Sequence, residues 1–326
     1  MLERCAEHTL TATKKQIDMQ RRQLVASGLA AGFAAATGLG LAGCAHRVAA
    51  HPKADKALAS ALAGIEKQSG GRLGVYVYDA VTGGEAGWRE RERFPMCSTF
   101  KTLLAAHVLH LAQEGQVDLG RQVAIAQTDL VTYSPVTEKY AGQPGGITVL
   151  ELCEAVVVLS DNTAANLILG ATGGPAALTA WLRREVGDKT TRLDRTEPSL
   201  NTAEPGDERD TSTPQAMNRT WQALLLGDVL KGYGRAMLQQ WLIDSRTGDK
   251  RVRAGLPADW KAGGKTGSGA HATFGDTLIV WPNARSEGLI ISAYLTGGQQ
   301  NFAQGDAVLA QAGAAIGQWY QQIQNG

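Results

Sequence analysis

The sequence predicts an α+β fold in which the two ends of the chain build one sheet and a helical domain is inserted between them. Apolar, β-branched stretches that indicate strands occur from residue 73 and again from residues 277 and 289. The residues between them show helical spacing, with Thr, Pro and Gly at the expected ends. A site at the boundary of two such domains would lie in a natural cleft.

The N-terminal part of the predicted sheet domain begins with a helix. Ala and Leu recur at helical spacing over residues 52–70, and Gly70 and Gly71 end the pattern. A strand follows over residues 73–79, and Thr82-Gly83-Gly84 then forms the turn of a hairpin. The next helical pattern covers residues 99–113.

The middle of the chain carries several helix starts. Thr148 and Glu151 form a capping box that opens a helix to about residue 159. Pro175 follows Gly173-Gly174, and Pro214 follows Thr213; each proline is typical of a first helical position.

The last part of the chain is predicted to hold a long loop, two further strands of the sheet and a closing helix. Residues 192–213 are polar and show no period, and a loop of that length inside a domain is usually functional or disordered. Strands are predicted over residues 277–281 and 289–295, and a closing helix over 302–323. The predicted domains are therefore 52–96 with 244–325 for the sheet, and 97–243 for the helices.

Composition excludes some classes of protein. The 326 residues suggest one or two domains. The chain has 32 Lys and Arg against 31 Asp and Glu, so a nucleic-acid partner is disfavoured. A hydrophobic share of 44% and a charged share of 19% argue against a disordered chain.

The N-terminal pattern predicts an export signal over residues 1–44. Arg21 and Arg22 form a twin-arginine pair before an apolar stretch over 24–42, which is rich in small residues. The stretch ends in Leu-Ala-Gly-Cys44, which resembles the lipobox of bacterial lipoproteins and predicts a lipid on Cys44. The alternative is a plain signal cleaved nearby. Met19 is a plausible start, and a periplasmic location follows from either reading.

No metal site or other cofactor is predicted. The sequence lacks CxxC and HExxH patterns. His107 and His110 share a predicted helix, and we expect a core or solvated pair there rather than ligands. Beyond residue 44 only Cys97 and Cys153 remain, which excludes a disulfide framework.

Three triplets carry the chemistry. Ser98 and Lys101 stand three residues apart at a helix start, where a lysine can serve as base for a serine nucleophile. Ser160-Asp161-Asn162 follows an apolar helix at a turn, and Lys265-Thr266-Gly267 could form a strand edge that lines a cleft. Each is weak alone, but together they match the S-x-x-K, S-D-N and K-T-G set of class A β-lactamases and penicillin-binding proteins.

With these motifs the chain resembles a class A serine β-lactamase, of the chromosomal Gram-negative type, from about residue 71 to the closing helix. The resemblance implies an α/β (α+β) fold, an antiparallel sheet flanked by helices with an inserted all-helical domain, as in β-lactamases and penicillin-binding transpeptidases. It also implies a monomer that takes β-lactam antibiotics and mechanism-based inhibitors such as clavulanate. Further matching stretches are residues 133–139, 160–166, 192–201 and 206–210.

The resemblance assigns the catalytic roles. Ser98 would be acylated, Lys101 would help to deprotonate it, and Ser160 would pass a proton to the leaving nitrogen. Glu197, with Asn201, would hold the hydrolytic water. Whether Lys101 or Glu197 is the base for acylation stays open.

The remaining site residues would bind the substrate. Asn162 would contact the acyl amide and Tyr133 would gate the cleft. Lys265, Thr266, Gly267, Ser268 and Arg251 would line the carboxylate side, and the N–H groups of Ser98 and Ser268 would form the oxyanion hole. An ion pair between Arg195 and Asp210 would close an omega loop over residues 195–210.

The chain also departs from the family. Ala105 and Gly269 stand where relatives carry cysteines that pair with Cys153 and Cys97, so neither disulfide is expected. Phe274 replaces an arginine common on its strand, and Arg251 matches the alternative arginine. Thr196 stands where Trp is common, which would alter the packing of the omega loop.

Two other functions share the motifs. A penicillin-binding DD-peptidase would be acylated without turnover, and Glu197 argues against it. A membrane-anchored sensor of the same fold would have lost part of the triplets, and all three are intact. The prediction is hydrolysis of penicillins and cephalosporins, with carbapenems left open.

Overall fold

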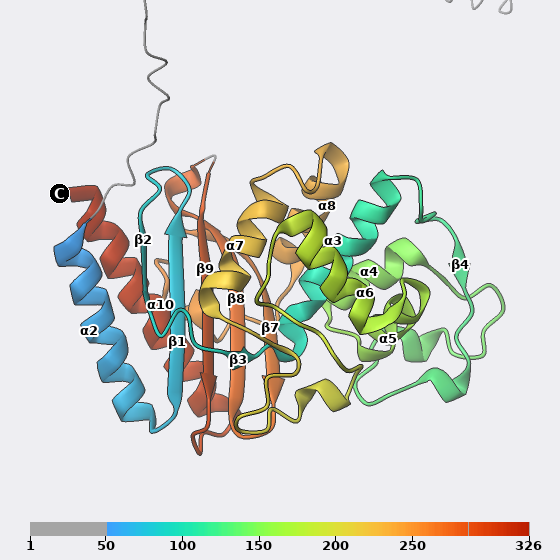
Figure 1. Cartoon of the computed structure of the whole chain (residues 1–326), viewed down its shortest axis with the longest axis horizontal. Helices are drawn as coiled ribbons and strands as arrows, with labels where there is room; N and C mark the ends of the chain where they lie inside the picture. Colours follow the sequence, from blue (N-terminus) through green and yellow to red (C-terminus); the bar gives the residue numbers. More distant parts are fainter. Residues whose placement is uncertain (1–50, 286, 326) are drawn as a thin grey trace, which may run out of the picture. The chain divides into compact units, whose positions relative to one another are not determined.

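A five-stranded sheet organises the computed structural model, which describes residues 51–285 and 287–325 (Figure 1). Every neighbouring pair of its strands is antiparallel. In spatial order the strands are β2 (Glu85–Trp88), β1 (Arg72–Asp79), β9 (Leu289–Thr296), β8 (Thr273–Trp281) and β7 (Lys261–Gly269). The two ends of the chain therefore build one sheet, as predicted, and the strand that carries the Lys-Thr-Gly triplet lies at its edge.

The two faces of the sheet are both buried. Ile291 packs with the helices α2 (Pro52–Ser69) and α10 (Phe302–Asn325), whereas its neighbour Ile290 packs with the remaining helices. Successive side chains of a strand point to opposite faces, so this alternation separates two hydrophobic clusters. Figure 1 shows α2 and α10 together at one side of the sheet.

Three helices of the middle segment begin where the sequence signals predict, at Thr148, Pro175 and Pro214. The Thr148 side chain accepts a hydrogen bond from the Glu151 N–H, and the Glu151 carboxylate accepts from the Thr148 N–H, which completes the capping box. The helices of this segment are α3 (Phe100–Gln113), α4 (Val149–Val158), α5 (Asn162–Ala171), α6 (Gly174–Trp181), α7 (Pro214–Leu225) and α8 (Gly232–Asp244), with short α9 (Val252–Gly255) near the sheet. A π-helical turn over Leu182–Val186 follows α6.

Helix α3 lies at the centre of the helical cluster. Its first ten residues are all buried, and a helix that is buried on every side belongs to a core. Helix α7, although it falls within 97–243, packs on β1 and β9 of the sheet. The division into a 52–96 plus 244–325 domain and a 97–243 domain stays a prediction.

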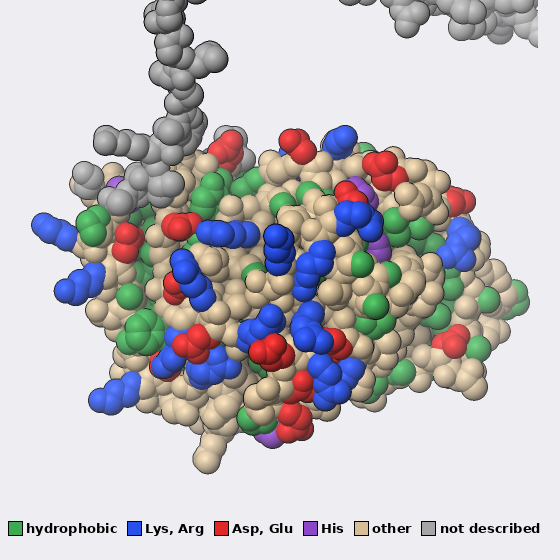
Figure 2. Space-filling view, in the orientation of Figure 1, with side chains coloured by type: hydrophobic (Ala, Val, Ile, Leu, Met, Phe, Trp, Pro, Cys, Tyr) green, Lys and Arg blue, Asp and Glu red, His purple; other side chains and the backbone are tan. Residues whose placement is uncertain are grey.

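Short ladders hold the loops. Strand β3 (Phe94–Pro95) pairs with β6 (Thr211–Ser212), and β4 (Gln122–Val123) pairs with β5 (Ile147–Thr148). The first ladder ties the segment before Ser98 to the end of the predicted omega loop. Charged side chains of both signs lie interspersed on the face seen in Figure 2. Ion pairs join charges of opposite sign in the chain, among them Arg192 with Asp194.

The predictions for Met19, for Arg21 and Arg22, and for a lipid on Cys44 lie outside the described residues. In the part of the chain that is described, no helix is long and apolar enough to cross a membrane.

Candidate active site

Ser98 stands in a 3₁₀ turn (Cys97–Thr99) directly before the first residue of α3. The turn is packed tightly against β7, because a Cβ atom on Gly267 would lie 2.6 Å from the Met96 carbonyl oxygen and 2.9 Å from the Ser98 nitrogen. Only glycine allows this approach. Ser98 thus meets the Lys-Thr-Gly strand at the positive end of a 14-residue helix.

A cavity of about 330 Å³ opens over Ser98. Its wall combines the segment 97–243 with the sheet segment: Ser98, Tyr133, Ser160, Asn162 and Asn201 come from the first, and Thr247, Thr266, Gly267, Ser268 and Phe302 from the second. Larger hollows exist elsewhere, among them one of about 450 Å³ beneath residues 203–208. The cavity over Ser98 contains the predicted nucleophile and parts of all three triplets, so the chemistry and not the size selects it.

Lys101 is completely buried and is surrounded by oxygen atoms. Its Nζ donates to the Ser160 carbonyl oxygen at 2.8 Å and to Asn162 Oδ1 at 2.5 Å. The same Nζ lies 3.0 Å from Glu197 Oε1. Burial lowers the pKa of Lys101, although the Glu197 charge opposes the shift. A lysine with a lowered pKa can exchange protons with a neighbouring acid or hydroxyl group.

Ser160 connects the two lysines of the motifs. Its Oγ accepts from Lys265 Nζ at 3.0 Å and lies 3.4 Å from Lys101 Nζ. Lys265 is buried, and its pKa is lowered strongly by burial and then by the charges of Lys101 and Arg251. Ser160 also has a positive φ of 60°, a conformation that non-glycine residues rarely adopt and that is common at functional sites.

Asp161, the middle residue of this triplet, has a structural role. Its carboxylate caps α5 through the Ala164 N–H and also accepts from the Val136 and Thr137 N–H groups. Next to it, Asn162 Nδ2 donates to the Thr132 carbonyl oxygen, and the Asn162 N–H donates to that of Tyr133.

These bonds fix the loop that carries Tyr133. That side chain is 58% exposed at the rim of the cavity, with a φ of 66°.

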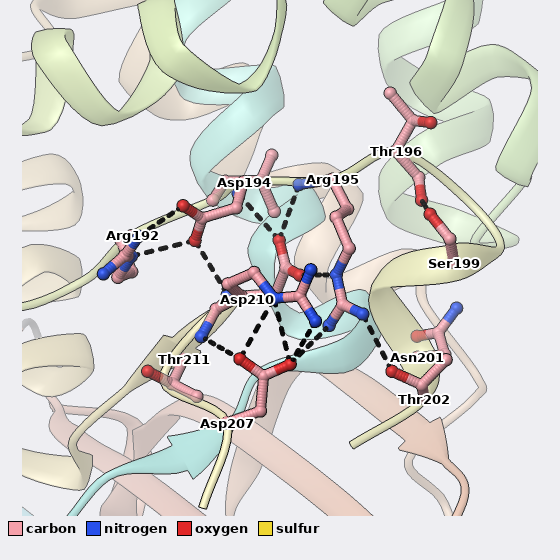
Figure 3. Close-up of polar contacts among 12 residues, drawn as sticks. Arg192, Asp194, Arg195, Thr196, Ser199, Asn201, Thr202, Asp207, Asp210 and Thr211 are labelled. Atoms are coloured by element: carbon pink, nitrogen blue, oxygen red, sulfur yellow. Dashed lines mark hydrogen bonds and ion pairs between the residues drawn. The ribbon is translucent and has the colours of Figure 1, made fainter. Parts of the chain in front are cut away.

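The predicted clasp of the omega loop is present (Figure 3). Arg195 Nε lies 2.5 Å from Asp210 Oδ2, and Asp210 Oδ1 accepts from the backbone N–H groups of Asp194 and Arg195. The Asp210 side chain is nearly inaccessible to solvent. The loop is therefore closed by both charge and backbone bonds, which explains how a polar segment without a period stays ordered.

Glu197 is held from two sides. Asn166 binds its backbone in both directions, accepting from the Glu197 N–H and donating to its carbonyl oxygen, each at 2.9 Å. Its carboxylate accepts from Asn201 Nδ2 at 2.5 Å and from the Ser98 hydroxyl at 3.4 Å. The predicted base Glu197, the nucleophile Ser98 and the amide of Asn201 are thus in contact. Asn166 received no role from the sequence, although it lies one helical turn after Asn162.

Arg251 lies behind the carboxylate side of the cavity rather than in its wall. It is 5% exposed and donates to Asp306 Oδ1 at 2.8 Å and to the carbonyl oxygens of Gly267 and Gly275. Its remaining contact, Nη2 to Ser268 Oγ at 2.7 Å, is the one that reaches a cavity residue. On the same wall, Thr266 Oγ1 donates to Thr247 Oγ1 at 2.8 Å. Thr247, Phe302 and Asp306 were not found from the sequence.

A buried carboxyl group lies beside this wall. Asp276 pairs in register with Thr266 across β7 and β8, and its Oδ2 accepts from the Val252 N–H. Its Oδ1 has no hydrogen-bond partner among the described residues. Burial raises the pKa of Asp276 to about 7.

The cysteines and histidines behave as packed side chains. Cys97 and Cys153 are buried, and among the described residues both are free thiols, as the sequence predicted. Burial raises the pKa of each to about 12. His107 stacks on Trp181 with ring centroids 5.0 Å apart, and burial lowers the pKa of His107 to about 4.

The arrangement defines a class of protein: a hydrolase that works through a serine acyl-enzyme. The serine lies at a helix start and contacts a buried carboxylate. It shares the cavity wall with a second serine that accepts hydrogen bonds from two buried lysines. These groups fulfil the requirements for a nucleophile, a base and a proton donor.

Comparison with known proteins identifies the family. Residues 56–320 match the family described as the Beta-lactamase enzyme family. The chain is 44% identical to β-lactamase L2 of Stenotrophomonas maltophilia, over 90% of this chain and 96% of that protein. A solved class A β-lactamase described as the last common ancestor of Gram-negative bacteria is 56% identical, with a TM-score of 0.77 over 80% of this chain and 98% of the other. A β-lactamase from Xanthomonas campestris is 45% identical, with a TM-score of 0.79 over 82% of this chain and 98% of that one.

The chain belongs to the class A serine β-lactamases. It is a hydrolase of the β-lactam amide bond, the activity through which this family confers antibiotic resistance.

Proposed function

We propose that the chain opens penicillins and cephalosporins through an acyl-enzyme on Ser98, with Glu197 as the base that releases the product. The observation that carries this proposal is the position of Glu197 between two groups. One of its carboxylate oxygens contacts the nucleophile Ser98, and the other contacts Asn201. A carboxylate placed in this way can accept a proton from Ser98 and later from a water beside Asn201.

Acylation begins when Ser98 Oγ attacks the lactam carbonyl carbon. Its proton passes to the Glu197–Lys101 pair, whose Oε1 and Nζ atoms are 3.0 Å apart. The Ser98 hydroxyl donates to Glu197, which favours Glu197 as the first acceptor, although 3.4 Å is long for direct transfer. In this proposal the N–H groups of Ser98 and Ser268 stabilise the oxyanion.

Breaking of the lactam C–N bond requires a proton on the leaving nitrogen. Ser160 Oγ supplies it in this proposal, because it stands in the cavity wall and accepts from Lys265 while lying near Lys101. Two buried lysines with lowered pKa values can then return a proton to Ser160. The ring-opened acyl group stays bound to Ser98.

Deacylation uses one water. Glu197 takes a proton from the water, which attacks the ester carbonyl, and the proton finally returns to Ser98 Oγ. Asn166 and the Arg195–Asp210 pair act through Glu197 by holding its loop in place. They are positioning residues.

The substrate would lie across the boundary between the two predicted domains, 52–96 with 244–325 and 97–243. Asn162 and Tyr133 would contact its acyl side, while Thr266, Gly267 and Ser268 would receive the carboxylate, with charge from Lys265 and Arg251. The supporting observation is that the cavity wall combines residues of both segments. Clavulanate-type inhibitors would occupy the same place.

Steady-state hydrolysis of benzylpenicillin and a cephalosporin tests the proposal directly. Wild type should turn over both, and Ser98→Ala should turn over neither while keeping its melting temperature within a few degrees. Wild type that is acylated once and then stalls would indicate a penicillin-binding protein. Activity retained in Ser98→Ala would show that the nucleophile is assigned wrongly.

Export to the periplasm is the further part of the proposal. Class A β-lactamases are generally exported, and the sequence supports a twin-arginine signal with a lipid on Cys44. Membrane fractionation and the mass of the mature N-terminus test this. A soluble protein that begins elsewhere than at residue 44 would contradict the lipid. Size-exclusion chromatography tests the proposed monomer.

A further inference from the structure

We propose that Phe302 is a specificity-determining residue that binds an aromatic group attached next to the carboxylate of a cephalosporin. This inference rests on the proposed function, because it concerns the same cavity and the same orientation of the substrate. The first turn of α10 delivers the residue to the cavity, whose other aromatic wall is Tyr133.

Three residues of that first turn connect α10 to the carboxylate side of the site. Phe302, Gly305 and Asp306 are separated by three and four positions and therefore share one side of the helix. Asp306 pairs with Arg251 at 2.8 Å. Gly305 allows α10 to come close to β8, because a Cβ atom there would lie 2.4 Å from the Phe274 ring. These two contacts hold the first turn of α10, and with it Phe302, beside the carboxylate wall of the cavity.

Phe302 is exposed although it is apolar and held in place. It is 66% accessible, and its ring meets the buried Phe274 ring edge to face, with centroids 5.6 Å apart and an interplanar angle of 84°. Among the described residues five large apolar side chains are exposed, and two of them, Phe302 and Tyr133, line this one cavity. Exposed apolar groups that gather at a polar site are typical of ligand contacts.

The position of Phe302 indicates which part of the substrate it would contact. Phe274, its aromatic support, is the register partner of Ser268 on the carboxylate side of the cavity. In cephalosporins the carbon next to the carboxylate-bearing carbon carries a variable substituent, whereas penicillins carry only methyl groups in that region. An aromatic substituent there would meet a ring already fixed by Phe274, so little side-chain entropy would be lost on binding.

Three substrates isolate the contact. Nitrocefin and cephalothin share a thienylacetyl side chain, but nitrocefin carries a dinitrostyryl group at the substituted ring carbon and cephalothin an acetoxymethyl group. Benzylpenicillin has no substituent of this kind. We expect Phe302→Ala to lower kcat/KM for nitrocefin about three- to tenfold, mainly through KM, the range for a lost aromatic pair. The values for cephalothin and benzylpenicillin should stay within about twofold, and Phe302→Tyr should restore nitrocefin hydrolysis.

Tyr233→Ala is the matched control, since Tyr233 is a 75% exposed aromatic residue on α8 that is not part of the cavity wall. It should change none of the three activities. An equal loss on all three substrates in Phe302→Ala, or no loss on nitrocefin, would overturn the inference. Wild type that hydrolyses none of them would instead overturn the proposed function, and this inference with it.

Discussion

Replacing Arg251 by alanine should weaken both the carboxylate side of the site and the fold behind it. The guanidinium donates four hydrogen bonds, to Asp306, to two backbone carbonyl oxygens and to Ser268 Oγ. Because Arg251 donates to that oxygen, the Ser268 hydroxyl proton is free to turn toward a substrate carboxylate. The variant removes the charge and this orientation together.

The expected size follows from these contacts. A hydrogen bond to a charged group contributes about 1.5–3 kcal/mol, which predicts a loss of about ten- to hundredfold in kcat/KM, carried mainly by KM. Clavulanate-type inhibition should weaken in parallel. The buried carbonyl oxygens of Gly267 and Gly275 also lose their donor, so the free energy of unfolding should fall by about 1–3 kcal/mol for each.

A double-mutant cycle separates the two effects. The kcat/KM of Arg251→Ala, Ser268→Ala and the double variant is measured on benzylpenicillin, with thermal melts as the check on folding. If Arg251 acts through Ser268, the two losses should overlap, and the double variant should be little worse than Arg251→Ala. Fully additive losses, or unchanged kinetics in Arg251→Ala, would refute the reasoning.

Three further predictions concern Asp276, Asn166 and the two cysteines. Because burial raises the Asp276 pKa from 3.8 to about 7, the folded state binds its proton more tightly than the unfolded chain, so this carboxyl group makes stability fall as the pH rises from about 4 to 7. Denaturant titrations of wild type and Asp276→Asn at about pH 4 and pH 7 test this. The variant should lose up to roughly 4 kcal/mol of the fall in unfolding free energy between the two pH values, and an unchanged pH dependence would refute the prediction. Asn166→Ala should slow deacylation more than acylation in stopped-flow traces, because it frees the Glu197 backbone; equal slowing of both steps would contradict this. Thiol titration of the denatured mature protein should find Cys97 and Cys153 both reduced, whereas a mass two hydrogens lower would show a disulfide.

The sequence predicted the elements whose signals are local. The capping box at Thr148, the prolines at positions 175 and 214, and the strand patterns after residue 73 each depend on residues close together in the chain, and the structure has helices and strands there. The Arg195–Asp210 clasp was expected from the resemblance and is present. Helix α8 was not predicted individually; Gly232, Gly234 and Tyr233 at its start give a weak helical signal.

The contacts that could not be predicted join residues far apart in sequence. Nothing in the sequence near Gly267 shows that the strand must approach the Met96 carbonyl oxygen, because that requirement arises only when the sheet closes on the turn before α3. The burial of Arg251 behind Ser268, and the arrival of Phe302 in the cavity, likewise depend on how α10 packs against β8. The side chains of the motifs were recognisable, but their supporting contacts were not.

Intact-protein mass spectrometry of Glu197→Ala after mixing with benzylpenicillin tests the central claim most directly. Removing a general base typically slows a step about 10²- to 10⁴-fold, and Ser98 keeps its place at the start of α3. We predict a lasting adduct on Ser98 whose mass equals the intact drug, while wild type, sampled in the same way, shows none. Turnover by Glu197→Ala at the wild-type rate would contradict the role assigned to Glu197, and a lasting adduct on the wild type would contradict hydrolysis itself.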